Sequence, residues 1–200
     1  MKVICISGKA QHGKDTSASI LKEILEGDGF SVLVTHYGDL VKYVCTQFFG
    51  WDGQKDVSGR HLLQYVGTDI IRTRNPDYWV AFVASILNFF KDRWDYVLIP
   101  DCRFPNEVDY LKECGFDVTH MRVSRTNFDT PLTKDQQNHP SETALDDTAA
   151  DYYITNNGTQ DDLRNAIYQL KPYLVEYHQI SFDELENETE SKNPFVGVAS

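Results

Sequence analysis

The stretch S-G-K-A-Q-H-G-K-D-T occupies residues 7–16, directly after the apolar run V-I-C-I at 3–6. The apolar run predicts a buried strand, and apolar residues at helical spacing after Lys14 predict a helix. Gly8 and Gly13 let the connecting backbone curl so that successive N–H groups point at phosphate oxygens, and the helix N-terminus adds the positive end of its dipole. Lys14 would reach the terminal phosphates of a nucleoside triphosphate. The stretch therefore predicts a phosphate-binding loop, with a plain glycine turn and an exposed lysine as the alternative.

The loop departs from the pattern G-x-x-x-x-G-K-[ST] at one position, because Asp15 replaces the hydroxyl residue that usually binds magnesium. Thr16 follows one place later, as in P-loop kinases that have a glycine between the lysine and the threonine, and we expect it to contact a phosphate. Asp15 either holds Mg²⁺ through water or favours the start of the helix. Mg²⁺ is the expected metal, and its direct ligands stay open.

Length and composition indicate one α/β domain. The chain has 200 residues, 41% of them hydrophobic, and a net charge of -11; we predict a domain over 1–177 and an acidic tail over 178–200. The negative charge argues against a surface for nucleic acid. Four cysteines without a C-x-x-C pair indicate reduced thiols in a cytosolic protein, not a zinc site. Since Met1 leads straight into a strand and no apolar run approaches about 20 residues, we expect no signal peptide, no membrane span and a cytoplasmic location.

Strands and helices alternate along the rest of the chain. The predicted strands after the first are 31–35, 94–101, 116–123 and 151–155. The predicted helices are 14–26, 40–49, 60–72, one that begins at about 75, 106–113, and one from 159 to about 177. In the helix that begins at about 75, the residues expected to face the core are Val80, Val83, Ile86 and Leu87. This alternation predicts a three-layer α/β/α fold around a mostly parallel sheet of about five strands. Ligands of such sheets bind at the carboxyl ends of the strands.

Two segments offer residues for a second ligand. Asp39 and Lys42 follow the second strand and would lie near the loop, unless they are only a helix cap and a solvated lysine. The helix 60–72 places Arg60, Gln64 and Arg72 off its apolar stripe. Arginine binds phosphate bidentately and glutamine can hydrogen-bond a base edge, so this segment could present a phosphorylated nucleotide; the alternative is an ordinary solvated face.

Further candidates lie at the ends of the later strands. Asp101 ends a buried strand, where an aspartate of P-loop enzymes supports magnesium or orients the attacking group, and the alternative is an ion pair with Arg103. The polar segment 125–147 has the length of a lid. Arg125 at its base is the candidate for stabilising charge on a transferred phosphoryl group. His139 is expected to be a hydrogen-bonding loop residue, since no second metal ligand has suitable spacing.

Four blocks of sequence carry a family resemblance. They are G-K-A-Q-H-G-K-D-T at 8–16, L-Q-Y-V-G-T-D-I-I-R at 63–72, D-C-R-F-P-N-E at 101–107 and H-P-S-E-T-A-L-D at 139–146. In this order, and over about 2–170, the chain resembles the deoxynucleoside monophosphate kinases of bacteriophages. The resemblance implies a P-loop kinase fold and transfer of the γ-phosphoryl group of ATP to a deoxynucleoside 5′-monophosphate.

The resemblance also implies roles for individual residues. The ATP site would contain Gly8, Lys9, His12, Gly13, Lys14, Asp15 and Thr16, and the acceptor site would contain Asp39, Lys42, Arg60, Gln64, Thr68, Arg72 and Trp79. The catalytic residues would be Lys14, Asp101, Arg103 and Arg125, and the lid would contain His139 and Glu142. Asp15 and Asp101 would hold Mg²⁺ through water. The sequence departs from the family at 37–39, where related kinases have a phenylalanine-alanine pair. The expected partners are ATP and a deoxynucleoside monophosphate, with a homodimer open and no nucleic acid polymer or membrane.

Three other functions stay open at this point. The S-E-T-A-L-D block and the later D-Y-Y-I-T-N at 151–156 also resemble phosphomevalonate kinases, so only the acceptor separates these two enzymes. A nucleotide-regulated binding module would hydrolyse ATP slowly and respond to a macromolecule. A structural protein with a vestigial loop would not bind ATP with Mg²⁺.

Overall fold

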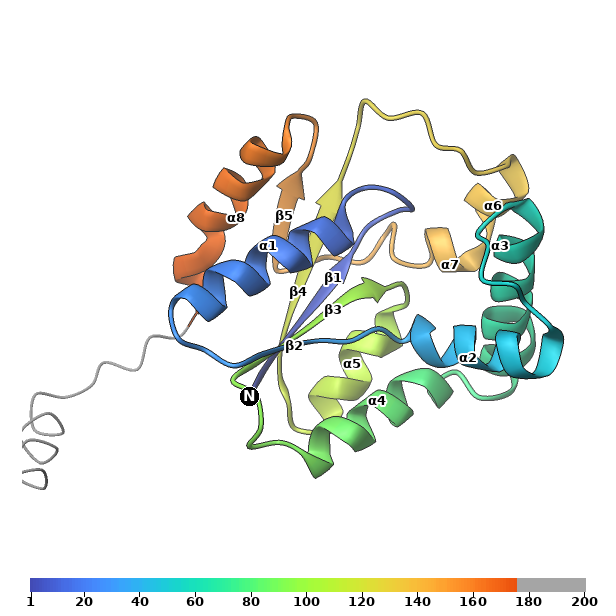
Figure 1. The fold of residues 1–200 in the computed structure, drawn as a ribbon, viewed down its shortest axis with the longest axis horizontal. Helices are drawn as coiled ribbons and strands as arrows, with labels where there is room; N and C mark the ends of the chain where they lie inside the picture. The colour runs from blue at the N-terminus through green and yellow to red at the C-terminus, as the bar shows by residue number, and fades with distance from the viewer. Residues whose placement is uncertain (176–200) are drawn as a thin grey trace, which may run out of the picture. The chain divides into compact units, whose positions relative to one another are not determined.

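The computed structural model describes residues 1–175 of the chain. Residues 1–169 form one compact unit, which contains the whole sheet (Figure 1). The predicted acidic tail and the predicted helix end near residue 177 lie outside the described residues. Across the described part, no helix combines the length and the apolar character needed to cross a membrane.

Five parallel strands form one sheet in the order β2-β3-β1-β4-β5. The strands are β1 (Lys2–Ser7), β2 (Val32–Val34), β3 (Tyr96–Cys102), β4 (Asp117–Ser124) and β5 (Tyr152–Thr155). The predicted fold class is confirmed, and the strands differ from prediction only at their ends. The phosphate loop follows β1, the central strand, and it therefore lies at the carboxyl edge of the sheet between β3 and β4.

Helices cover both faces of this sheet. They are α1 (Lys14–Gly27), α2 (Gly38–Phe49), α3 (Val57–Gln64), the π-helix η1 (Tyr65–Arg72), α4 (Tyr78–Phe89), α5 (Pro105–Glu113), α6 (Lys134–Asn138), α7 (Pro140–Thr143) and α8 (Gln160–Leu174). Crossovers between parallel strands are right-handed. Since α1 leads from β1 to β2 and α5 leads from β3 across β1 to β4, the two helices lie on opposite faces.

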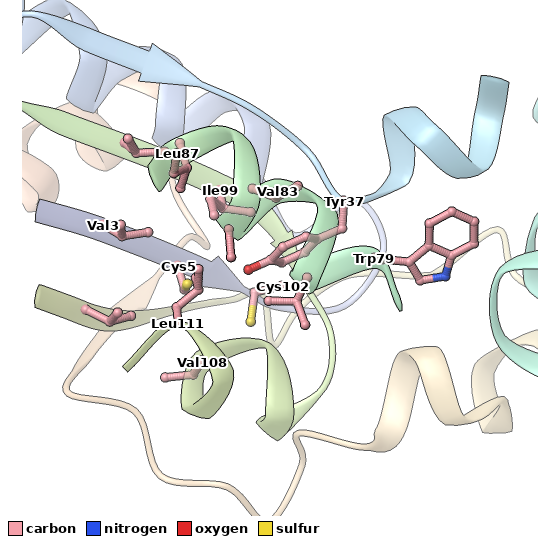
Figure 2. Close-up of a cluster of buried hydrophobic side chains, with 14 of the residues drawn as sticks. Val3, Cys5, Tyr37, Trp79, Val83, Leu87, Ile99, Cys102, Val108 and Leu111 are labelled. Carbon is pink, nitrogen blue, oxygen red and sulfur yellow. The ribbon is translucent and has the colours of Figure 1, made fainter. Parts of the chain in front are cut away.

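The core on the α4–α5 side shows the alternation expected of a strand. Val3 and Cys5 of β1 point toward Leu87 of α4 and Leu111 of α5 (Figure 2). The intervening residue Ile4 faces the α1 side of the sheet and is fully buried. The four cysteines are unpaired, as predicted, and all but Cys114 are buried.

The predicted helix 60–72 is two elements and begins earlier than expected. The Asp56 side chain accepts a hydrogen bond from the Gly59 N–H at 2.7 Å and so caps α3, which begins at Val57, before the predicted start at residue 60. After Gln64 the backbone changes to a π-helix, whose i→i+5 bonds make a wider turn. Positions counted at 3.6 residues per turn are therefore displaced beyond this point, and Arg72 is buried instead of lying on a solvated face.

The helix predicted to begin near residue 75 begins at Tyr78. Residues 75–77 form a turn in which the Asp77 N–H donates to Asn75 Oδ1 at 3.2 Å. The prediction that Ile86 faces the core is wrong, since 39% of its surface is exposed. The 12 residues of α4 include no charged side chain, so apolar residues occur all around the helix and their period does not mark the buried face.

The predicted lid 125–147 contains two short helices. Thr133 caps α6 through its side chain and Gln136 reaches back to the Thr133 N–H at 3.2 Å. His139 caps α7, because its Nδ1 accepts from the Ser141 N–H at 3.2 Å. The segment is thus a folded part of the compact unit 1–169.

Candidate active site

Two glycines fix the path of the phosphate loop. Gly8 has φ +146°, and a Cβ at this position would lie 2.2 Å from the Val123 carbonyl oxygen of β4. Gly13 has φ +101°, and its Cβ would lie 2.4 Å from Asn156 Nδ2. The amide of Asn156 donates to the His12 carbonyl at 3.0 Å and so braces the loop from the residue after β5. Only glycine fits at these two turns.

Lys14 lies under the loop and points into it. Its Nζ donates to the Lys9 carbonyl at 2.9 Å, and only 7% of the residue is exposed. Burial, together with the nearby charge of Arg103, lowers the pKa of Lys14 to about 8. No carboxylate forms an ion pair with Lys14 within residues 1–175. An anion in the loop would therefore be its natural partner.

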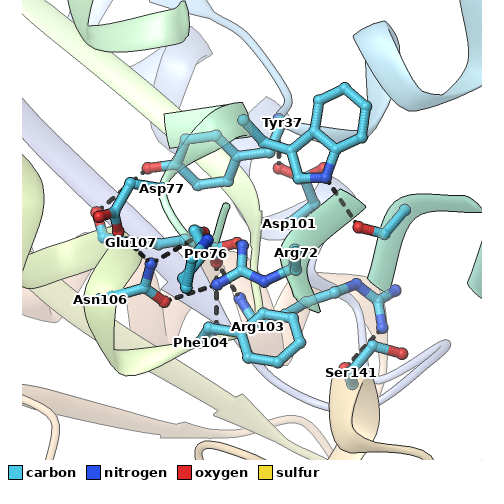
Figure 3. Close-up of polar contacts among 12 residues, drawn as sticks. Tyr37, Arg72, Pro76, Asp77, Asp101, Arg103, Phe104, Asn106, Glu107 and Ser141 are labelled. Atoms are coloured by element: carbon cyan, nitrogen blue, oxygen red, sulfur yellow. Dashed lines mark hydrogen bonds and ion pairs between the residues drawn. The ribbon is translucent and has the colours of Figure 1, made fainter. Parts of the chain in front are cut away.

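Asp101 joins the end of β3 to the start of α2. Its Oδ1 accepts from the Tyr37 N–H at 3.0 Å and its Oδ2 from the Gly38 N–H at 2.7 Å (Figure 3). The ion pair with Arg103 that the sequence left open is not formed, because Arg103 pairs with Glu142. The carboxylate of Asp101 faces the same cavity as Lys14 and Asp15.

Arg103 contacts Glu142 of the predicted lid next to the phosphate loop. The Nη1 of Arg103 pairs with Glu142 and donates to the Ser141 carbonyl at 2.9 Å. The other oxygen of Glu142 accepts from the Ala10 N–H of the loop at 2.9 Å. The helix α7 is thereby attached directly to the phosphate loop.

A dyad of Asp15 and His36 stands at the start of α1. His36 Nε2 lies 3.0 Å from Asp15 Oδ1, and His36 Nδ1 lies 3.5 Å from Asp39 Oδ2. The hydrogen bond between the two lowers the pKa of Asp15 and raises the pKa of His36. Thr16 lies exposed on the first turn of α1. Sequence reasoning assigned His36 no role, since a histidine after a short strand carries no pattern.

One cavity of about 360 Å³ joins the loop to the predicted acceptor residues. Of the seven acceptor candidates, six line it: Lys42, Arg60, Gln64, Thr68, Arg72 and Trp79. Asp39 does not line it, and its carboxylate pairs with Lys42 at 2.7 Å. Lys14, Asp15, Asp101 and Arg103 line the same cavity. The structure thus brings most of the predicted acceptor residues together with Lys14 and Asp15 of the predicted ATP site. Of the other predicted ATP-site residues, Gly8, Lys9 and His12 line a second cavity, and Gly13 and Thr16 line neither cavity.

Buried contacts hold the acceptor side in place. Arg72 Nη1 lies 2.9 Å from Glu107 Oε1, and its guanidinium stacks on the Phe104 ring at 3.7 Å (Figure 3). The indole N–H of Trp79 donates to the Gly67 carbonyl at 2.8 Å. Sequence reasoning gave Glu107 no role, although it belongs to the D-C-R-F-P-N-E block. Its position three residues after Phe104 could have revealed one, because a glutamate at this position accepts a hydrogen bond from the backbone N–H at the start of the helix.

Lys55 is a second residue that sequence reasoning missed. It lines the cavity beside Arg60. Burial and the charges of Lys42, Arg60 and Arg103 lower the pKa of Lys55. Neither Lys55 nor Arg60 forms an ion pair in the described part of a chain with a net charge of -11. Unpaired cations facing one cavity indicate an anionic ligand.

The lid residues differ in where they lie. Arg125 is close to the loop, since its N–H donates to His12 Nδ1 at 3.2 Å, but it does not line the cavity. The guanidinium carbon of Arg125 is 5.0 Å from the centre of the Phe128 ring, and its buried Nε has no partner. His139 bridges α7 and η1: its Nδ1 is 2.9 Å from Ser141 Oγ and its Nε2 is 3.1 Å from Asp69 Oδ1. His139 is therefore the hydrogen-bonding residue that was predicted.

Comparisons with known proteins agree with the resemblance in the sequence. A family model for deoxynucleotide monophosphate kinase matches residues 35–167, about two thirds of the chain. The deoxynucleotide monophosphate kinase of Enterobacteria phage T4 is 34% identical over 113 residues, which cover 55% of this chain and 44% of that protein. A relative from Acanthamoeba polyphaga mimivirus is 27% identical in an alignment of 194 residues that covers 84% of this chain and 94% of that protein. The aligned part of the chain spans less than half the length of the phage T4 relative.

A solved structure supports the fold. The Mycobacterium tuberculosis APS kinase, in complex with AMPPNP and APS, superposes with a TM-score of 0.50 and 12% sequence identity. The match covers 86% of this chain and 97% of that one. The P-loop kinase fold predicted from the sequence is confirmed.

Proposed function

The chain belongs to the deoxynucleotide monophosphate kinase family, and on this premise we propose that it transfers the γ-phosphoryl group of ATP to a deoxynucleoside 5′-monophosphate. One observation carries the proposal: a single cavity of about 360 Å³ is lined both by residues of the phosphate loop and by the unpaired cations Lys55 and Arg60. Its volume lies in the range of small-molecule sites, about 300–1,000 Å³. Two anionic substrates could meet there end to end.

The loop side suits the phosphates of ATP. The N–H groups of residues 8–16 and the start of α1 supply donors and a dipole for anions. Lys14 is desolvated and lacks a carboxylate partner in the described residues, so a phosphate would restore its ordinary charge state. We place Arg125 on the ATP side as well, because its buried Nε lacks a partner next to the loop.

The opposite side suits a monophosphate. Arg60 offers a bidentate donor to a phosphate, and Lys55 and Lys42 add charge. Gln64 and Trp79 line the same cavity and would contact the base. Arg72 is held by Glu107 and supports this wall through its buried ion pair.

Phosphoryl transfer requires positioning more than covalent help. In the proposed reaction a phosphate oxygen of the acceptor attacks the γ-phosphorus, and the bond to the β-γ bridging oxygen breaks to release ADP. Lys14 and Arg103 both line the cavity and would stabilise the charge on the transferred group. The segment 125–147 would exclude water, which otherwise competes as acceptor.

The residues present fit a Mg²⁺ ion that arrives with ATP. Within the described residues no three His, Cys, Asp or Glu side chains gather into a metal site. Mg²⁺ usually binds one or two carboxylates together with substrate phosphates and waters. Asp15 and Asp101 both line the loop end of the cavity and would hold the ion through water. When bound, Mg²⁺ would neutralise phosphate charge.

The test is ADP release from ATP and Mg²⁺ with each monophosphate in turn, in ribose and deoxyribose forms, alongside phosphomevalonate. We expect stimulation by one or a few deoxynucleotides and formation of the matching diphosphate. Stimulation by phosphomevalonate alone would move the chain to the other kinase class. No stimulation by any acceptor would overturn the proposal. These substrates are metabolites of the cytoplasm, which is the proposed place of action.

A further inference from the structure

The phosphate loop is in contact with an anion that belongs to the protein itself. The Ala10 N–H donates to Glu142 Oε2 at 2.9 Å, and Arg103 pairs with Glu142 Oε1. Only 5% of the Glu142 side chain is exposed. Burial would raise the pKa of Glu142, but Arg103 and the Ala10 N–H hold it below its ordinary value, so the group is charged. A carboxylate thus occupies a position whose hydrogen-bond donors would also suit a phosphate.

The loop and Arg103 cannot serve Glu142 and a triphosphate at once. Ala10 lines the same end of the cavity as Lys14, where the proposed transfer takes place. A phosphate oxygen that accepts from the Ala10 N–H would have to replace Glu142 Oε2. If the carboxylate stayed, two anions would lie in contact in a site with little water, and like charges at that distance repel strongly.

A second cavity next to Glu142 could accept the displaced carboxylate. Glu142 and Arg103 form the wall between the main cavity and a second one of about 210 Å³. The second cavity is lined by Lys9, His12, Arg103 and Arg122, and also by Asp146, whose carboxylate pairs with Lys9 at 3.0 Å. Arg122 forms no ion pair within residues 1–175, so its guanidinium is the cation with which a displaced carboxylate would pair.

We propose that, in the nucleotide-free protein, the Glu142 carboxylate occupies the position where the transferred phosphoryl group would bind. The terminal phosphate of a triphosphate then displaces this carboxylate. This inference rests on the proposed function only in requiring that the loop bind a polyphosphate. Glu142 then lowers the affinity of the empty loop for phosphates. A purely structural glutamate would do the opposite, since its loss would loosen the site and weaken binding.

The experiment compares Glu142→Gln with Glu23→Gln. Both substitutions remove one negative charge and keep the side-chain shape, but Glu23 is an exposed partner of Arg164 on α1. The probes are inorganic pyrophosphate and a non-hydrolysable ATP analogue, titrated by calorimetry at pH 7. We expect Glu142→Gln to bind both about tenfold more tightly than the natural chain and Glu23→Gln to stay within about twofold, where tenfold corresponds to about 1.4 kcal/mol.

Unchanged or weaker binding by a folded Glu142→Gln protein would overturn the inference. If this variant does not fold, Glu142→Asp replaces it: the shorter side chain keeps the charge but cannot hold both Ala10 and Arg103, so tighter binding is again expected, and equal or weaker binding again contradicts it. Polyphosphate binding without transfer to any monophosphate would overturn the proposed function alone. Equal affinities in an active kinase would overturn the role of Glu142 alone.

Discussion

Glu107 and Arg72 form an ion pair that is almost withdrawn from water: Oε1 and Nη1 are 2.9 Å apart, and the side chains are 4% and 8% exposed. The second oxygen, Oε2, accepts from the N–H groups of Arg103 at 2.6 Å and Phe104 at 3.1 Å. One buried side chain therefore connects the acceptor wall in η1 with the segment that carries the proposed catalytic arginine. Loss of Glu107 would disturb both.

We expect Glu107→Ala to destabilise the fold by about 3–5 kcal/mol, because it removes the carboxylate partner of a buried guanidinium and leaves two backbone donors without an acceptor. Urea denaturation measures this loss. The control is Asp117→Ala, which breaks the more exposed pair with Lys2 at 3.6 Å and should cost about 1 kcal/mol or less. Equal losses in the two variants would show that Glu107 does not hold the site together.

Gly8 is predicted to tolerate no side chain. Gly8→Ala would drive a Cβ into the Val123 carbonyl at 2.2 Å, whereas Gly29 also has a positive φ but nothing within 4 Å of its Cβ. We expect Gly8→Ala to lose about 4 kcal/mol or more together with ATP binding, and Gly29→Ala to lose about 1 kcal/mol. Thermal unfolding with and without ATP distinguishes the two. A Gly8→Ala protein that binds ATP normally would contradict this loop geometry.

Lys14 is predicted to be required for turnover and not for folding. Lys14→Met keeps the length of the side chain and removes the charge, so the rate of ADP formation should fall about 10²–10³-fold or more. Lys22→Met alters an exposed lysine of the same helix, paired with Glu26, and should leave the rate unchanged. Circular dichroism checks the fold of both proteins. Full activity in a folded Lys14→Met protein would remove the phosphate-loop assignment.

ATP binding is predicted to take up a proton above pH 8. Lys14 has a pKa of about 8 in the empty protein, and contact with phosphate raises it again, so affinity should fall by up to about tenfold per pH unit above pH 8. Because the unfolded chain binds this proton up to about pH 10.5, Lys14 alone makes the fold more stable as pH rises through that window. Calorimetry in buffers of different ionisation enthalpy measures the uptake. Lys14→Arg, which stays charged, should show none; a flat affinity of the natural chain from pH 7.5 to 9.5 would contradict the prediction.

The sequence predicted those site residues whose position follows from the residues next to them in the chain. The two glycines and Lys14 define the loop by their spacing alone, and Asp101 was placed correctly because strand ends gather at one edge of a parallel sheet. Glu107 and Lys55 were missed because their importance comes from what other segments bring to them. Their partners lie in η1 and across the cavity, and no spacing in the chain encodes that meeting.

Arg72 is a predicted acceptor residue for which the structure shows a further, structural role. The resemblance placed it in the acceptor site, and it does line the cavity. Its guanidinium, however, is already bound by Glu107 and by Asn106 Oδ1 at 2.5 Å. The π-helical turn is what brings it inward, and helical periodicity cannot foresee a change of pitch.

The short helix α7 faces two ways. Glu142 contacts the phosphate loop, while Ser141 Oγ lies 3.5 Å from Gln64 Nε2 on the acceptor wall. Residues this close on one turn cannot shift independently, so an ATP molecule that displaced Glu142 as proposed would also move Ser141. Thermodynamic linkage would then require reciprocity: whatever factor ATP contributed to the affinity for the proposed monophosphate, the monophosphate would contribute to the affinity for ATP. A four-residue helix would thereby couple the two proposed substrates before any chemistry takes place.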